Sequence, residues 1–539
     1  MPGWLSRLAS APALVPLHGR TFRLLWLAWL AANLTMWMND VAAAWLMTQL
    51  TTSPVMVAMV QTASTLPVFL LGIPSGALAD TVDRRRYFAM TQLWVSVNAL
   101  VLAAVLFAGL MTAPLLLGLT FVNGVGLAMR WPVFAAIVPE IVPRNQLSPA
   151  IALNGIAMNL SRVIGPVLAG VLLAAFNDAV VFALNAVLAA VAFGLVLTWR
   201  SQPRTSALPG ERFVGALRAG VNFARQSPRL QQVLLRVFLF FLQSTALIAL
   251  LPLVARDMHG GGPATFTVML ACLGAGAIVA ALLFPRWRAR WHRDQFIWGG
   301  TLAQAVLAVL IVYVHELWVA LPAMVLVGMA WISVANSLTV SAQLALPDWV
   351  RARGMAIYQT ALMGGSAASS ILYGWIADLL DVPAAIACAS GVGVVGLLLL
   401  RKRRLEGQPE PDYTPQVPAN LPEPAVGVAA EDGPVMVMVE YTIDPMRSAA
   451  FAEVMQRTRR ARLRQGALSW GLFRDAAHPE RWIEYFVDEN FIEHQRRVER
   501  FSAFDAGLRE ERLSFHIGEG PPRVTRYIGQ SVATQDTPR

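Results

Sequence analysis

The sequence predicts an all-α membrane protein of twelve transmembrane helices arranged as two six-helix halves, followed by a small α+β, ferredoxin-like cytoplasmic domain. Three observations predict it: an excess of apolar residues, long apolar runs separated by loops of alternating charge, and an abrupt change of composition near residue 405. Of the 539 residues, 56% are hydrophobic and only 14% are charged, and the mean hydropathy is +0.53. Soluble domains carry about a quarter charged residues, so most of this chain belongs in a lipid bilayer.

The apolar runs give the number of spans. A helix needs roughly 20 mostly apolar residues to cross the hydrocarbon core, and helices satisfy the backbone polar groups that lipid leaves unpaired. Twelve runs qualify, and they lie near residues 22–48, 54–78, 87–109, 114–137, 150–175, 179–199, 232–254, 264–284, 295–314, 317–343, 354–378 and 383–400.

The loops between the runs orient the chain. Arginines follow the even-numbered runs, as in 84–86, 200–218, 286–293 and 401–404. The alternate loops are short and contain no arginine except Arg256. Cytoplasmic loops hold the excess of Lys and Arg, so we expect a multi-pass protein of the cell (inner) membrane with both termini in the cytoplasm. Because the arginines lie between apolar runs, the net charge of +10 is interpreted as a topology signal, and no nucleic-acid partner is expected.

Other classes of protein are disfavoured by local signals. Cys272 and Cys388 both lie inside apolar runs, so a disulfide framework is not expected. The first twenty residues lack the uninterrupted apolar core of a cleaved signal peptide. The sequence contains no phosphate-binding GxxxxGK[ST] pattern, so it gives no sign that ATP drives transport directly.

The domain organisation follows from the longest cytoplasmic loop. It separates a first half, residues 1–200, from a second half, residues 232–404, with the loop itself at 201–231. Segment 346–362 repeats features of 138–156, and 280–290 stands where 76–86 stands in the first half. Paired halves with a site between them near mid-membrane are typical of transporters.

The C-terminal part begins with a linker at 405–434 that is rich in proline and glutamate. Residues 435–530 then alternate between strand and helix patterns. We predict strands at 435–443, 468–475, 481–487 and 523–528, with one helix ending near Arg464 and another near Leu513. This βαββαβ order is that of a ferredoxin-like unit.

The loop between the second and third runs, 76-GALADTVDRRR-86, resembles the signature of the major facilitator superfamily (MFS). The matching residues are Gly76, Leu78, Ala79, Asp80, Arg84 and Arg85, while Thr81 and Asp83 depart from the pattern. The resemblance implies a gating loop that latches the outward-facing state, with the carboxylate near a helix N-terminus. The alternative is that the arginines only fix topology and that Asp80 only marks a helix end.

The fifth run carries 159-NLSRVIGPVLAG-170, which resembles the antiporter motif of the same superfamily through Ser161, Gly165, Pro166, Ala169 and Gly170. The resemblance implies export. Small residues also let helices approach closely, and proline removes a backbone hydrogen bond. Ordinary tight helix packing is therefore the alternative interpretation.

A polar cluster is predicted inside the first half. Arg162 lies roughly 20 Å along its helix, where a charge is costly and generally faces a cavity or a partner. Asn159 shares its helical face, and Asp40, with Asn33 two turns away, supplies the natural partner from the first run. We predict a cavity in which Asp40 binds and releases the coupling proton. The alternatives are a static Asp40–Arg162 pair that holds the first half together, or a position of Asp40 near the outer mouth.

Two further observations bear on the cavity. Thr120 stands where many proton-coupled members of the superfamily carry an arginine. Arg130, nearly three turns later, is interpreted as a charge that snorkels towards the cytoplasm, with a cavity residue as the alternative. The second half contributes few buried charges, which suits a bulky, partly apolar solute. Its polar residues are alternatively interhelical contacts: Gln243, Gln304, Asn336, Gln343 and Gln359.

The order of these features resembles the enterobactin-exporter-like branch, or transmembrane secretion effector family. The C-terminal domain resembles the antibiotic-biosynthesis-monooxygenase type of dimeric α/β barrel. The first resemblance implies an efflux carrier for siderophores or hydrophobic drugs driven by proton antiport. His478, His494 and His516 are widely spaced, so no catalytic constellation, metal site or cofactor is predicted. A sensing role or dimerisation is expected of the C-terminal domain.

The sequence therefore predicts a secondary active exporter, not an enzyme, whose partners are a small-molecule substrate, the proton and the lipid bilayer. Two alternatives stay open. One is an uptake carrier of the same fold, and the other is a membrane-tethered enzyme or sensor that acts through the C-terminal domain.

Overall fold

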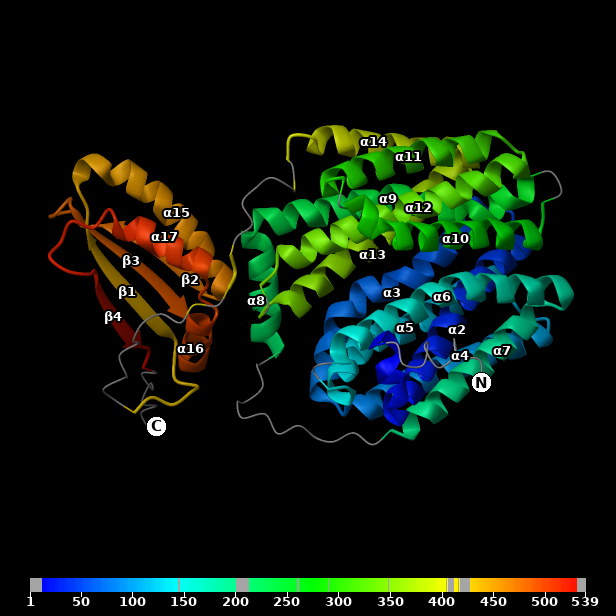
Figure 1. The fold of residues 1–539 in the computed structure, drawn as a ribbon, viewed down its shortest axis with the longest axis horizontal. Helices are drawn as coiled ribbons and strands as arrows, with labels where there is room; N and C mark the ends of the chain where they lie inside the picture. The colour runs from blue at the N-terminus through cyan, green and yellow to red at the C-terminus, as the bar shows by residue number, and fades with distance from the viewer. Residues whose placement is uncertain are drawn as a thin grey trace, which may run out of the picture. The chain divides into compact units, whose positions relative to one another are not determined.

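A computed structural model describes residues 12–143, 146–199, 213–258, 261–288, 290–347, 349–403, 405, 412–414, 416 and 427–530. Contacts between Cα atoms divide the chain into two compact units. The first, here the helical unit, comprises Met1–Leu208, Val233–Ser341 and Tyr358–Gly407. The second, here the mixed unit, comprises Pro209–Gln232, Ala342–Ile357 and Gln408–Arg539. Figure 1 shows the helices and strands of both.

Each predicted apolar run corresponds to a long helix. After the short 3₁₀ helix η1 (Pro12–His18), the first half consists of α2 (Arg20–Leu50), α3 (Pro54–Thr81), α4 (Arg84–Phe107), α5 (Ala113–Ile141), α6 (Leu147–Ala175) and α7 (Asp178–Leu197). The second half consists of α9 (Pro228–Asp257), α10 (Pro263–Arg288), α11 (Arg293–Tyr313), α12 (Leu317–Leu344), α13 (Arg351–Leu379) and α14 (Val382–Leu400).

Ten helices, counted over the described residues, are long and apolar enough to cross a membrane. They are α3 to α7, α9 to α12 and α14. The protein is thus a largely helical, multi-pass membrane protein. That α2 and α13 also span, which would complete twelve, stays a prediction.

Short polar residues between the runs begin the helices. The Asp83 carboxylate accepts a hydrogen bond from the backbone N–H of Arg86 (2.8 Å) at the start of α4. Asn177 caps α7 in the same way, and Asp381 caps α14. Side-chain oxygens at these positions satisfy N–H groups that the first helical turn leaves unpaired. Asp83, which departs from the family signature, thus serves as a helix cap.

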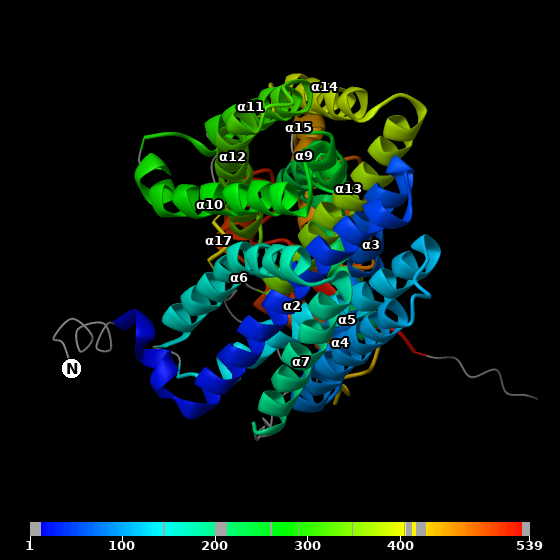
Figure 2. The same cartoon turned by 90° about the vertical axis from the view of Figure 1, so that its right-hand side faces the viewer.

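Two hydrophobic clusters organise the helical unit. The larger contains residues of all twelve long helices, and in each helix these residues lie towards the end predicted to be extracellular; examples are Met38–Met47 of α2 and Ala246–Ala255 of α9. The second contains only first-half residues from the opposite ends, such as Phe22, Phe88 and Phe134. Figure 2 shows the two halves on opposite sides, with α10 beside α6 and α13 beside α3.

The mixed unit contains an antiparallel sheet of β1 (Val435–Thr442), β2 (Ser469–Arg474), β3 (Arg481–Asp488) and β4 (Arg523–Ile528) in the order β2-β3-β1-β4. A helix, α15 (Ser448–Gln465), joins β1 to β2 while β3 lies between them. This split βαβ arrangement is that of the predicted ferredoxin-like unit. All four predicted strands are present to within a residue or two.

The second predicted helix of this domain is divided. It forms α16 (Phe491–Glu499) and α17 (Ala503–Leu513). Ser502 begins α17, because its hydroxyl bonds the Asp505 carboxylate (2.6 Å), which also accepts from the Ser502 backbone N–H (3.1 Å). This reciprocal cap favours a new helix start over continuation of α16.

Candidate functional site

One face of α2 presents the polar residues of the first half. Asn33, Trp37 and Asp40 follow one another at spacings of four and three residues, so they lie on the same side of the helix. Asp40 is half-buried, and its carboxylate accepts a hydrogen bond from the Ser64 hydroxyl of α3 (3.1 Å). Ser64 was not predicted, because a single serine in an apolar run carries no distinguishing pattern.

Arg130 of α5 reaches the same helix, α2, two turns before Asp40. Its side chain is fully buried, so the predicted snorkelling towards the cytoplasm is wrong. One guanidinium nitrogen donates to the Ala32 carbonyl (2.6 Å) and the other to the Asn33 side-chain oxygen (3.5 Å). The guanidinium also lies 5.3 Å from the ring centroid of Trp29. These partners hold Arg130 inside the first half.

Arg162 of α6 occupies a different environment. Its guanidinium carbon lies 5.0 Å from the Trp37 ring centroid and 4.4 Å from that of Trp331, which belongs to α12 in the second half. Within the part of the chain that the structure describes, this guanidinium makes no hydrogen bond and no ion pair. Asp40 and Arg162 therefore do not pair in this structure: Asp40 accepts from Ser64, and Arg162 lies against two indole rings. The Asn159 side chain lies outside the described residues.

The predicted antiporter motif places two glycines at helix contacts. A Cβ atom on Gly165 would lie 2.6 Å from the Cβ of Trp37, so the glycine lets α2 and α6 approach at the level of Arg162. A Cβ atom on Gly170 would lie 2.0 Å from the Thr267 hydroxyl of α10. Pro166 lies buried between them. The motif therefore joins α6 both to its own half and to the other half.

The predicted gating loop is only partly described. The Asp80 side chain and the surroundings of Gly76 are not among what the structure describes, although both backbones belong to α3. The Arg85 guanidinium donates to the Leu197 carbonyl (2.6 Å) and so joins the start of α4 to the end of α7. Arg84 also has an interaction partner. A latch role for this loop stays a prediction.

The two halves also meet through polar contacts. At their predicted extracellular ends, the Ser53 hydroxyl donates to Asp378 (3.1 Å), and the Thr62 hydroxyl donates to the Ala367 carbonyl (3.4 Å). Within the second half, the Gln243 amide donates to the Thr301 carbonyl of α11 (3.2 Å). This bond fits the interpretation of Gln243 as an interhelical contact.

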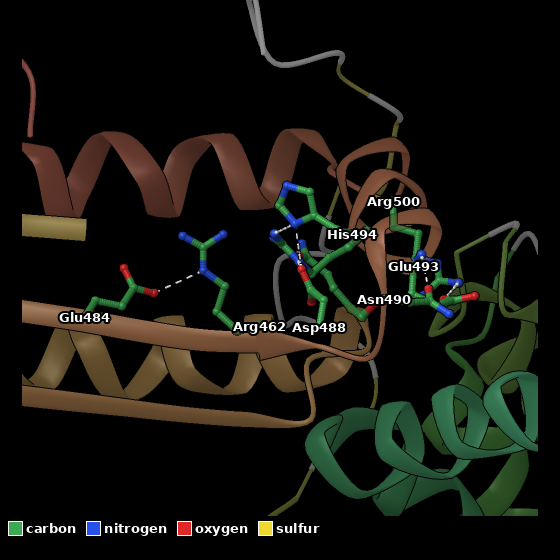
Figure 3. A network of polar contacts seen from close by, with 9 residues as sticks. Arg462, Glu484, Asp488, Asn490, Glu493, His494 and Arg500 are labelled. Carbon is green, nitrogen blue, oxygen red and sulfur yellow. Dashed lines mark hydrogen bonds and ion pairs between the residues drawn. The ribbon is translucent and has the colours of Figure 1, made fainter. Parts of the chain in front are cut away.

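The C-terminal domain holds a buried charge network that is largely paired (Figure 3). The carboxylate of Glu484, fully buried on β3, accepts from Tyr441 (3.0 Å), Arg462 (3.0 Å) and Trp470 (3.1 Å). Burial alone would raise the pKa of Glu484, but Arg462 and Arg512 outweigh it and hold that pKa below its usual value.

Asp488 repeats this pattern at the end of β3. Burial opposes ionisation, yet Arg497 and His494 bring the pKa of Asp488 below its usual value. His494 lies 2.7 Å from the Asp488 carboxylate, and Arg497 donates to the same group at 2.9 Å. Because these charged groups bind one another, the network fits a stabilising role between sheet and helices.

The domain packs against α8 (Phe213–Gln226), the helix of the central loop, inside the mixed unit. Arg464 of α15 pairs with Asp505 (3.0 Å), and its guanidinium lies 5.9 Å from the Phe223 ring centroid. Arg218 of α8 donates to Glu489 (2.8 Å). These contacts attach the domain to a helix that leads directly into α9.

The two-half helical architecture, with an arginine held between aromatic rings of the two halves, is that of a membrane transporter of the major facilitator type. A family model described as "Transmembrane secretion effector" matches residues 11–534. The chain therefore belongs to the transmembrane secretion effector family, whose members are MFS-type membrane transporters and not enzymes.

Similar proteins agree with this class. The chain is 23% identical over 265 residues to macrolide efflux protein A of Streptococcus pyogenes, which covers 49% of this chain and 65% of the relative. It is 22% identical over 254 residues to the staphyloferrin A transporter of Staphylococcus aureus, which covers 46% of this chain and 63% of the relative. The chain thus spans slightly less than two thirds of the length of these relatives.

Solved structures share the fold. A bacterial homologue of the human lysosomal transporter Spinster, in an inward-facing and unoccupied conformation, aligns with a TM-score of 0.55 at 14% identity, over 72% of this chain and 95% of that one. The nucleoside transporter NupG aligns with a TM-score of 0.57 at 13% identity, over 71% and 98%. At these identities the likeness concerns the fold alone.

Proposed function

We propose that the chain is a secondary active transporter of the cell membrane that exports a small, partly hydrophobic molecule by alternating access, in exchange for protons. The observation that carries this proposal is the network of Asp40 with Ser64 and of Arg130 with Asn33, which lies beside Arg162 at the junction of the two halves. A carboxylate held by one hydroxyl and one nearby cation in a low dielectric is suited to reversible protonation.

The distribution of the hydrophobic clusters supports alternating access. Both halves share one core at the ends predicted to be extracellular, whereas the first half has a separate core at the opposite ends. A carrier closed towards the outside is expected to have this arrangement. Rocking of one half against the other would then separate the shared core and expose the site to the other side.

Export, as the direction of transport, is supported by two resemblances. The motif with Gly165, Pro166 and Gly170 resembles that of antiporters, and one relative bears the name of a macrolide efflux protein. An uptake carrier of the same fold is the second candidate. Comparing resistance and the secreted small molecules of one host with and without the protein separates export from uptake and reveals the chemical class.

Proton coupling is tested with Asp40→Asn. With a compound identified by that comparison, inverted vesicles carrying the variant should lose accumulation driven by a pH gradient, because the amide binds no proton, while exchange without a gradient persists. Asp257→Asn is the matched control, since this exposed aspartate at the end of α9 pairs with Arg256. Full gradient-driven accumulation by Asp40→Asn would refute the coupling role.

The C-terminal domain is proposed to sense or to dimerise. Its sheet turns Val435 and Val437 to the helices and leaves Met436 and Met438 on the other face. On that face Phe473, exposed by 58%, stacks on Tyr485 with ring centroids 5.7 Å apart. Unchanged transport after deletion of 405–539 would make the domain accessory to transport.

A further inference from the structure

We infer that Arg162, Trp37 and Trp331 form the part of the substrate site that binds an anionic group on a planar, partly aromatic compound. This inference rests on the proposed transport function and adds the chemical class of its substrate. Arg162 and Trp37 belong to the first half and Trp331 to the second, so the three side chains meet where the halves join. Transporters of this architecture bind their substrates at such a junction.

The state of the guanidinium points to an anion. Arg130 donates to Ala32 and Asn33, but Arg162 contacts only the two indole rings among the described residues. A guanidinium carries five N–H donors, and among the described residues those of Arg162 meet no hydrogen-bond acceptor. The side chain is half-buried and so remains accessible to a ligand. An anion bound there would supply the missing acceptors.

A second donor lies beside the first. The indole nitrogen of Trp37 is buried and has no hydrogen-bond partner. The Trp37 side chain is positioned by α6, because Gly165 allows the Trp37 Cβ to lie directly against that helix. Two unpaired donors on neighbouring side chains call for a ligand group with several acceptor atoms. Carboxylates and sulfonates are such groups, and Arg binds carboxylates in bidentate fashion.

The charge balance favours the same ligand. Arg130 is held by the Ala32 carbonyl and the Asn33 side chain, whereas among the described residues Arg162 faces two aromatic rings and no carboxylate. A ligand cation would be repelled by Arg162, although two indole rings alone would attract it. The rings instead offer stacking surfaces, and Trp331 continues into an edge-to-face contact with Phe241 at 5.7 Å. The ligand portion next to the anionic group is therefore expected to be planar and apolar.

The test measures equilibrium binding to the full chain in nanodiscs, with empty nanodiscs subtracted. Three probes of one shape are compared: 2-naphthoate, its neutral amide, and 2-naphthylmethylammonium. The wild type should bind 2-naphthoate about 10-fold or more tightly than the amide, as charge-assisted hydrogen bonds predict, and the ammonium most weakly. Arg162→Gln should abolish that preference and Arg162→Lys should restore part of it.

Controls separate this inference from the transport mechanism. Arg256→Gln removes an arginine at the end of α9 and should keep the preference for 2-naphthoate. Asp40→Asn should also keep it while losing proton-driven transport, so failure of coupling and failure of anion binding give different results. Equal binding of the acid and the amide by the wild type, or an unchanged preference in Arg162→Gln, would overturn the inference.

Discussion

Gly170 gives the sharpest test of how the halves meet. A Cβ atom at this position would lie 2.0 Å from the Thr267 hydroxyl and 2.2 Å from its methyl group. Thr267 is buried, and its hydroxyl donates to the Pro263 carbonyl (2.8 Å), so turning the side chain away would break that bond. Real Cβ contacts essentially never fall below 3.0 Å, so Gly170→Ala must move α6 and α10 apart by at least 3.0 − 2.0 = 1.0 Å.

The energetic effect combines two opposing contributions. Overpacking costs about 1–3 kcal/mol, while replacing glycine by alanine inside a helix gains about 0.5–1 kcal/mol. The overpacking energy applies only to conformations in which α6 and α10 touch. The stabilisation of the helix by alanine applies to all conformations. The closed arrangement should therefore lose about 1–3 kcal/mol relative to an open one. Since 1.4 kcal/mol is a factor of ten, the open population should rise about 10-fold.

Cysteine accessibility measures this population. Val57, buried in the core that both halves share, is replaced by cysteine in a chain whose two native cysteines are serines. A membrane-impermeant maleimide should label Val57→Cys about 10-fold faster when Gly170→Ala is present. Gly194→Ala is the matched control, because a Cβ there meets nothing within 4 Å. Equal labelling rates in all three chains would refute the proposed contact.

Two further predictions concern the mixed unit. Because the folded-state pKa values of Glu484 and Asp488 lie below their usual values, these carboxylates stabilise the domain above about pH 5, and that stability falls as the pH drops through their folded pKa values. The hydrogen-exchange protection of β1–β4, which compares each amide with an unstructured amide at the same pH, should therefore fall when the full chain is acidified, and should fall less in Glu484→Gln. Protection that does not change with pH would contradict this. Arg464→Gln leaves the buried Asp505 without its arginine partner and should destabilise the docking of α8 by about 2 kcal/mol, which corresponds to about 30-fold faster hydrogen exchange in α8. Arg457→Gln removes an exposed pair with Glu511 and should change that exchange little. Equal effects of the two variants would argue against docking through Arg464.

Local patterns predicted the elements well. Apolar length marked every long helix, and strict alternation in 435-VMVMVEYTI-443 marked β1, which runs from Val435 to Thr442. These signals are local, because a lipid environment and a half-buried strand each impose their own period on neighbouring residues. The division between α16 and α17 was missed because it depends on the side-chain cap between Ser502 and Asp505.

The sequence predicted which residues belong to the site better than it predicted which of them contact one another. Depth in an apolar run identified Asp40 and Arg162 as unusual charges, and helical spacing placed Asn33 on the face of Asp40. The same depth argument failed for Arg130, because snorkelling and burial give the same sequence pattern. Its burial depends on the Ala32 carbonyl and the Asn33 side chain, which only packing of α5 against α2 brings within reach.

By itself, the sequence determined that this protein is a two-half helical membrane protein with a split βαβ domain, since hydropathy, charge asymmetry and alternation are properties of consecutive residues. Only the tertiary structure decided which charges are satisfied. Arg130 is bound within its own half, while Arg162 meets Trp37 and, from the other half of the chain, Trp331. The physical reason is that a guanidinium is satisfied by whatever acceptors or rings surround it in space, and those neighbours are set by helix packing rather than by position along the chain.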